Sequence, residues 1–252
     1  MAEVMRNVFK ADILRVLKKK SFLLLSVIQI LVMVAAAVIA KFFPGDDLNS
    51  AFKVGISIGV LPYTILIGIP VFLAVFSDDF RSHAMQVAIG RGTSRGRLIR
   101  CRFFEVVFVF CETALVFSVV IIALAIIITG SMKNGTDALS ALWQGVVSAI
   151  CWAAISMIFV YAMQKATMAL VLYILMALGT VTAILASVSE MVPFLRDNHI
   201  HLDYCTVSTV LSRAVDTSDK LWVLMWVILV AAFIVLPLVI TTLLFKKKEL
   251  EF

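Results

Sequence analysis

Long uninterrupted runs of apolar residues, separated by short polar stretches, dominate the sequence. The six runs cover residues 22–40, 54–76, 106–130, 141–163, 166–189 and 221–245. A helix needs about 20 residues to cross a hydrocarbon core of about 30 Å, so each run is long enough. Lipid offers no hydrogen-bond partners, and the runs lack the alternation of a membrane β-strand. The pattern predicts a single all-α integral membrane domain, residues 1–252, with six transmembrane helices.

Composition agrees with this pattern. The chain is 62% hydrophobic and 15% charged, whereas soluble domains are about half apolar and a quarter charged. These values exclude an ordinary soluble enzyme and a disordered chain, and four cysteines are too few for a disulfide scaffold. The first run exceeds the 7–15 residues of a signal-peptide core and follows a charged stretch, so a span is favoured over a cleaved signal.

Basic residues collect on one predicted side of the membrane. When the runs are threaded through a bilayer, 16 of the 22 Lys and Arg residues fall on one face. The positive-inside rule then predicts that both termini are cytoplasmic. The net charge of +6 therefore reflects the predicted membrane topology. Nucleic acid is not an expected partner, because the cations lie close to the span ends.

Residues 3–20 precede the first span and predict an amphipathic helix. One broad face carries Val4, Met5, Val8, Phe9, Ile13 and Val16, although Asp12 and Arg15 depart from the pattern. Such a helix lies along the inner membrane surface; a solvated leader is the alternative. On the opposite side, residues 190–220 predict a structured link with a short amphipathic helix around 207–215.

The loop from 77 to 105 predicts a second helix outside the membrane. Ser77 suits an N-cap, two aspartates follow it, and Gly90 and Gly92 end the helix. The expected helix comprises Ser77, Asp78, Asp79, Phe80, Arg81, His83, Ala84, Met85, Val87, Ala88 and Ile89. An exposed apolar face on this helix invites a protein partner. A basic interfacial hairpin that binds lipid headgroups is the alternative interpretation.

No motif in the sequence predicts a bound cofactor, and a metal site is not favoured. The glycines near Gly92 lack the following Lys-Ser/Thr of a phosphate-binding loop, so any ATP would be hydrolysed by another chain. Four possible metal ligands, His199, His201, Asp203 and Cys205, fall within seven residues. Their alternate spacing in an irregular link favours coincidence over a metal site.

Inside the spans, the polar and helix-breaking residues are few. Glu112 is the one formal charge within the six runs, and Glu105 lies seven residues earlier on nearly the same face. Glu112 is interpreted either as a structural group paired near the inner interface or as a polar point on a transport path. Candidate kink or pathway residues are Gly55, Gly59, Pro62 and Pro70, with close helix packing as the alternative for the glycines.

The layout resembles the type-2 permeases of ATP-binding-cassette exporters. The local resemblance runs from Asp79-Phe80 to Gly92-Thr93-Ser94-Arg95, with His83-Ala84 where the family often has Gly-Thr. The resemblance implies that residues 77–89 form a coupling helix that docks into a separately encoded ATP-binding subunit. It also implies two ATP-binding subunits carrying ATP and Mg²⁺, a second permease copy in a homodimer or heterodimer, and a bacterial plasma membrane.

The resemblance further implies export of an amphipathic peptide, an antimicrobial or another hydrophobic small molecule. The chain itself would then be a transport subunit and not an enzyme. Two other classes stay open: an ion-coupled secondary transporter, for which Glu112 is the one supporting residue, and a sensor or immunity subunit that transports nothing. A membrane enzyme acting on lipids would need Asp, His or Ser clustered at one depth, and no such cluster is found.

Overall fold

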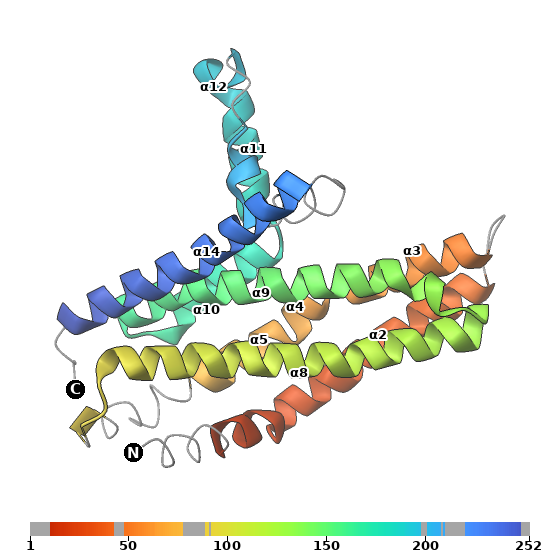
Figure 1. The fold of residues 1–252 in the computed structure, drawn as a ribbon, viewed down its shortest axis with the longest axis horizontal. Coiled ribbons are helices and arrows are strands. Elements are labelled where there is room, and N and C mark those ends of the chain that lie inside the picture. The colour runs from red at the N-terminus through yellow and green to blue at the C-terminus, as the bar shows by residue number, and fades with distance from the viewer. Residues whose placement is uncertain are drawn as a thin grey trace. The chain divides into compact units, whose positions relative to one another are not determined.

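The computed structural model describes residues 11–42, 48–77, 89–90, 92–197, 201–207, 209 and 220–247, and this part of the chain contains helices and no strand (Figure 1). The principal helices are α2 (Lys20–Phe42), α3 (Leu48–Val60), α4 (Tyr63–Leu66), α5 (Gly68–Phe72), α8 (Arg95–Thr129), α9 (Thr136–Met163), α10 (Ala166–Ala177), α11 (Thr180–Met191), α12 (Pro193–Asp197) and α14 (Lys220–Lys247). Short segments of other helix types are η1 (Leu73–Ser77), η2 (Met132–Gly135) and η3 (Leu202–Cys205).

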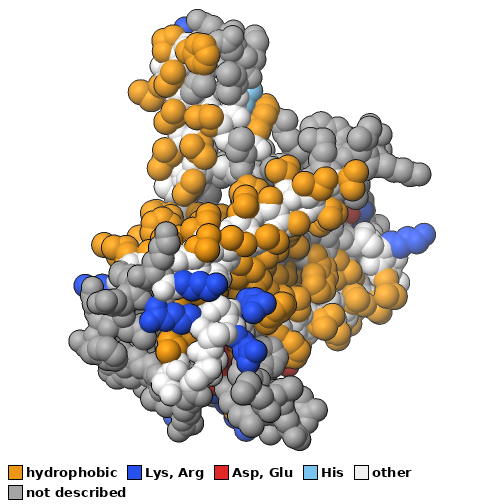
Figure 2. All heavy atoms as spheres, turned by 60° about the vertical axis from the view of Figure 1, so that its left-hand side comes forward, with side chains coloured by type: hydrophobic (Ala, Val, Ile, Leu, Met, Phe, Trp, Pro, Cys, Tyr) orange, Lys and Arg blue, Asp and Glu red, His pale blue; other side chains and the backbone are white. Residues whose placement is uncertain are grey.

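Five helical stretches are long and apolar enough to cross a membrane. They are Lys20–Phe42, Leu48–Ser77, Arg95–Thr129, Met132–Met163 and Trp226–Lys246, and the bent pair α10 and α11 makes a sixth if it counts as one span. Figure 2 shows hydrophobic side chains covering much of the described surface. Such extensive exposed apolar surface is unusual for a soluble protein. The described residues thus bear out an all-helical chain with five or six candidate membrane-spanning helices, while the sidedness of the termini stays a prediction.

The chain divides into two units. One contains residues 1–75 and 101–146, and the other contains residues 76–100 and 147–252. Helices α8 and α9 each begin in one unit and end in the other. The single-domain prediction is not tested by this division, because continuous helices join the two units.

In the first unit, small residues bring α2 and α3 close together. A Cβ atom on Gly55 would lie 2.9 Å from the Cβ of Ala40, and one on Gly59 would lie 3.0 Å from the Cβ of Ala36. The side chain of Gln29 donates a hydrogen bond of 2.9 Å to the carbonyl of Gly59. Small residues at such positions let helix backbones approach within a membrane. Both glycines therefore act in packing, and a role in a pathway stays a prediction.

The second predicted span is interrupted. Helix α3 ends at Val60, Pro62 precedes α4, and Pro70 lies within α5, which leads into the π-helical segment η1. Proline removes a backbone donor and disturbs the preceding turn, which accounts for a helix in short pieces. The hydroxyl of Tyr63 donates to the carbonyl of Phe110 over 3.0 Å and so ties this broken region to α8.

In the second unit, the fifth predicted span is broken. Helices α10 and α11 form an angle of 65°, and Gly179 between them has a φ of +72°. Only glycine adopts this left-handed conformation without steric cost, so the break is encoded locally. By contrast, α14 continues through Pro237 as one helix. The predicted outer helix at 207–215 lies mostly outside the described residues.

Candidate functional site

The predicted coupling helix lies almost wholly outside the described residues. Ser77 ends η1, and Ile89 belongs to a short helical stretch with Gly90. The undescribed members are Asp78, Asp79, Phe80, Arg81, His83, Ala84, Met85, Val87 and Ala88. The coupling helix therefore stays a prediction.

The four-residue motif Gly92-Thr93-Ser94-Arg95 forms a turn that leads directly into α8. Gly92 has a φ of +86°, and its N–H donates to the carbonyl of Ile89 over 2.9 Å. The carbonyl of Ser94 accepts bonds from the N–H groups of Arg97 and Leu98, at 3.0 and 3.1 Å. A glycine is required where the chain turns left-handed, so the motif ends one helical stretch and starts the next.

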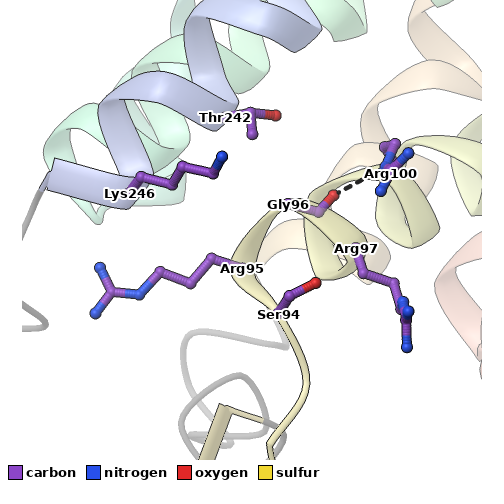
Figure 3. A pocket seen from close by; sticks show the side chains of 7 residues that line it. All are labelled: Ser94, Arg95, Gly96, Arg97, Arg100, Thr242 and Lys246. Carbon is purple, nitrogen blue, oxygen red and sulfur yellow. Dashed lines mark hydrogen bonds between the residues drawn. The ribbon is translucent and has the colours of Figure 1, made fainter.

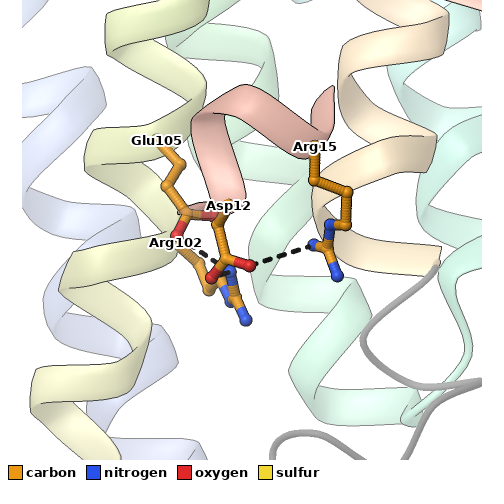
Figure 4. A network of polar contacts seen from close by, with 4 residues as sticks. All are labelled: Asp12, Arg15, Arg102 and Glu105. Carbon is orange, nitrogen blue, oxygen red and sulfur yellow. Dashed lines mark hydrogen bonds and ion pairs between the residues drawn. The ribbon is translucent and has the colours of Figure 1, made fainter. Parts of the chain in front are cut away.

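The segment ahead of the first span is called the leader here, and residues 11–20 are its described part. Buried charges attach this segment to the first turns of α8 (Figure 4). Residues 11–17 are helical, and Ile13 and Val16 are buried. Arg102 Nη1 lies 2.7 Å from Asp12 Oδ2 and contacts both carboxylate oxygens of Glu105, at 2.8 and 2.7 Å. The sequence pattern treats Asp12 as a departure from amphipathicity, and the structure explains it as the partner of Arg102.

The leader network consists of Asp12, Arg15, Arg102 and Glu105, and its positive and negative charges are equal in number. Arg15 lies 3.8 Å from Asp12, so two carboxylates meet two guanidinium groups. The side chain of Glu105 is 1% exposed and that of Arg102 is 8% exposed. Buried ions need a partner, because an uncompensated charge in the interior costs several kcal/mol. The network therefore holds the leader at the point where α8 enters its apolar run.

Glu112 lies two turns further along α8 and is half-buried. Its Oε2 is buried and has no hydrogen-bond partner among the described residues. The predicted pairing of Glu112 with a cation or backbone donor thus gains no support from this part of the chain. Phe108 and Leu115, which neighbour it at helical spacing, are exposed. The role of Glu112 as a polar point on a path stays a prediction.

An apolar pocket of about 370 Å³ lies in the second unit, beside the broken fifth span. Its walls come from α9, α10, α11, α14 and the segment after η3: Trp152, Ile155, Phe159, Leu172, Met176, Val181, Thr182, Leu185, Thr206, Val207 and Phe233. This volume is at the small end of the range for ligand sites, which are mostly apolar with a few placed polar groups. The bend at Gly179 places the start of α11 at this pocket, which the uniform hydropathy of residues 166–189 does not predict.

Two threonines supply the polar groups of this apolar pocket. Thr182 Oγ1 donates to Thr206 Oγ1 over 3.3 Å. Thr206 Oγ1 in turn donates to the carbonyl of Asp203 over 2.9 Å. The hydroxyls thus also connect α11 to the link that follows η3.

The possible metal ligands do not assemble in the described part of the chain. No group of three or more His, Cys, Asp or Glu side chains there is placed to hold a metal ion. His201 stacks on Tyr204 with ring centroids 4.7 Å apart, while His199 and the side chain of Cys205 lie outside the described residues. The metal interpretation gains no support here.

Comparison with known proteins adds no family. No family model matches the sequence, and no curated protein and no solved structure matches it.

Proposed function

We propose that this chain is the membrane permease subunit of a type-2 ATP-binding-cassette exporter in a bacterial plasma membrane. The observation that carries the proposal is the turn at Gly92–Arg95, which follows the predicted coupling helix and begins α8. Helix α8 has 35 residues, which at 1.5 Å per residue makes it about 52 Å long. A displacement of the turn by a partner subunit would be carried along this helix into the membrane.

The energy source in this proposal is ATP bound by a separate subunit. ATP binding shifts the permease between two states only as far as the assembly binds ATP differently in each. Two copies of the ATP-binding subunit would act on two permease copies through the segments at 77–89. The positive-inside pattern supports a cytoplasmic position for these segments.

The proposed cargo is an amphipathic peptide or another hydrophobic molecule. The apolar pocket beside Gly179 supports this choice, because Trp152, Phe159 and Phe233 contribute aromatic surface to it. Its two threonine hydroxyls suit a cargo that carries a few polar groups. A broken helix next to a pocket also supplies an element that can rearrange between two states.

A matched pair of glycine variants tests the proposal. The chain is purified together with the ATP-binding subunit encoded beside it, and ATP hydrolysis is measured in nanodiscs. Gly92→Ala forces a side chain onto a left-handed residue, whereas a Cβ on Gly90 meets nothing within 4 Å. We expect Gly92→Ala to lower stimulated hydrolysis at least several-fold and Gly90→Ala to leave it unchanged. Equal activity of the two variants, or failure of the subunits to associate, contradicts the proposal.

Accessibility provides a second test of the same proposal. In a variant whose only cysteine is Met85→Cys, an impermeant thiol reagent should label the protein only after the cells are opened. A variant that keeps only the native Cys205, which is predicted to lie outside, is the matched control and should be labelled in intact cells. Labelling of position 85 from outside would refute the coupling role.

An ion-coupled secondary transporter is the second candidate function. The buried Oε2 of Glu112, which has no hydrogen-bond partner in the described part of the chain, and the break at Gly179 favour it, since such transporters use intramembrane carboxylates and discontinuous helices. Uptake driven by an ion gradient in ATP-free proteoliposomes, lost in Glu112→Gln, would establish this function in place of the exporter. A sensor or immunity subunit would show ATPase coupling without movement of cargo.

A further inference from the structure

A strongly basic pocket lies where the start of α8 meets the end of α14 (Figure 3). It has a volume of about 330 Å³ and belongs wholly to the second unit. Helix α14 contributes two of its residues and the region around the start of α8 contributes five; together they are Ser94, Arg95, Gly96, Arg97, Arg100, Thr242 and Lys246. Four of these seven are cationic and none is acidic, so the pocket concentrates positive charge.

Close contact between the two helices builds this basic pocket. A Cβ on Gly96 would lie 3.1 Å from Thr242 Cγ2, so a larger residue would press on α14. Arg95 Nη1 donates to the carbonyl of Phe245 over 2.8 Å, and its guanidinium lies 5.4 Å from the centre of the Phe245 ring. Arg95 therefore fastens the end of α14 to the start of α8 and forms one wall of the pocket.

The remaining cations are placed to bind a ligand. Arg100 uses its Nε to donate to the carbonyl of Gly96 over 3.2 Å, and among the described residues its two Nη groups have no hydrogen-bond partner. Arg97, Arg100 and Lys246 are exposed. Guanidinium groups bind phosphate oxygens through paired hydrogen bonds, and lysine adds a point charge. The positive end of the α8 dipole adds to the same field.

The position of the basic pocket along the spans indicates where its ligand comes from. The pocket lies at the ends of the third and sixth spans, on the predicted cytoplasmic side, where lipid headgroups meet water. Leu243 and Leu244, next to the pocket on α14, are exposed by 54% and 42% and suit contact with acyl chains. Basic pockets between membrane helices on this side are a known kind of site for anionic headgroups.

The positive-inside rule alone requires only that cations lie near the span ends. It does not require that Arg100 and Lys246, from two different helices, line one cavity together with Thr242 and Ser94. We propose that this basic pocket binds a phosphate group, and that the source of the phosphate is the headgroup of an anionic phospholipid in the inner leaflet. Arg100 and Lys246 contact the phosphate oxygens, while Arg95 positions the pocket wall.

The test compares two double variants with the same loss of charge. Arg100→Gln/Lys246→Gln removes two cations from the basic pocket, and Lys18→Gln/Lys20→Gln removes two exposed cations from the leader on the same predicted face. Each purified protein is titrated with phosphatidylglycerol and with phosphatidylcholine, and bound lipid is counted by native mass spectrometry. Correct folding of each variant is checked by its helix content. If the pocket double variant does not fold, the milder variant Lys246→Gln takes its place.

We expect the wild-type protein and the leader variant to retain phosphatidylglycerol in preference to phosphatidylcholine. The pocket variant should bind phosphatidylglycerol about 30-fold more weakly, since two cations that contact the bound phosphate in the pocket are lost and each contributes about a factor of five, whereas the leader lysines do not line the pocket. Equal losses in both double variants, or no loss in the pocket variant, would overturn the site.

A further arm separates the two sources of phosphate. Inorganic phosphate is added to lipid-depleted protein, and thermal stability is followed against chloride at equal ionic strength. No specific stabilisation, together with the lipid preference, supports the headgroup assignment. Stabilisation by phosphate that is lost in the pocket variant, without any lipid preference, overturns the lipid source. Neither arm uses an ATP-binding subunit, so its result is independent of the proposed export function.

Discussion

The leader network offers the sharpest test of the structure, through Arg102→Gln. Arg102 Nη1 lies 2.7 Å from both Asp12 Oδ2 and Glu105 Oε2. Glutamine keeps much of the side-chain length and removes the charge. Because the side chain of Glu105 is 1% exposed, it would then hold a buried negative charge without its Arg102 partner. Asp12, at 16% exposure, would lose the same partner with partial access to solvent.

The expected magnitudes follow from burial. Breaking one partner out of a buried ion pair costs about 3–5 kcal/mol, so Arg102→Gln should lower the free energy of unfolding by that amount. Glu105→Gln should cost less, about 1.5–3 kcal/mol, because Arg102 keeps its contact with Asp12. In the double variant Arg102→Gln/Glu105→Gln both charges are removed, so neither position holds an unpaired charge. Its cost should fall short of the summed single costs by at least about 1 kcal/mol.

Unfolding is measured by titrating sodium dodecyl sulfate into mixed micelles and following helix content. Lys18→Gln, an exposed cation in the same leader region, is the control and should change stability by less than about 0.5 kcal/mol. The buried ion pair between Arg102 and Glu105 is refuted if Arg102→Gln costs no more than this control. It is also refuted if the two single effects add to within about 0.5 kcal/mol, because additive effects mean that Arg102 and Glu105 do not interact.

Three further predictions concern packing within each unit. Gly55→Ala should destabilise the protein by about 1–3 kcal/mol, since its Cβ would lie 2.9 Å from that of Ala40; the same unfolding titration measures it, with Gly90→Ala as the neutral control. Tyr63→Phe should cost about 1 kcal/mol by removing the bond that its hydroxyl donates, and an unchanged midpoint would contradict this. Gly179→Ala should cost about 1–2 kcal/mol of stability, because it places a side chain on a residue with φ of +72°. It should also weaken the binding of a fluorescent apolar ligand to the apolar pocket. Unchanged binding would mean that the bend at Gly179 does not shape this pocket.

The existence of the membrane helices is predictable because lipid leaves the backbone no alternative to helix. Their ends are less predictable, as α8 shows. The third apolar run begins at Val106, yet the helix begins at Arg95. The intervening charges do not stop it, because Arg102 and Glu105 lie one turn apart and pair on the helix itself. Hydropathy reports where a helix enters lipid and not where it begins.

Contacts between distant segments have no local signature in the sequence. Asp12 and Arg102 are 90 residues apart, and the residue spacing around Asp12 indicates only a flaw in an amphipathic face. The basic pocket likewise joins Gly96 to Thr242, two residues with no shared motif. The break at Gly179 has one local sign, the glycine itself, but other glycines such as Gly55 lie within continuous helices. Only the positive φ separates these two cases.

Three features involve successive residues at the start of α8, and their roles are separable by experiment. The turn at Gly92 precedes the helix, the basic pocket surrounds Gly96, and the leader network begins at Arg102. If α8 carries motion from a partner, Gly92→Ala should uncouple ATP hydrolysis and leave lipid binding near wild type, with a stability cost of only about 1–2 kcal/mol from its left-handed backbone. The Arg100→Gln/Lys246→Gln variant should lose lipid and keep the leader attached, whereas Arg102→Gln should lose stability first. Variants that fail in all three assays together would mean that this end of α8 is a single structural unit and not a junction of three functions.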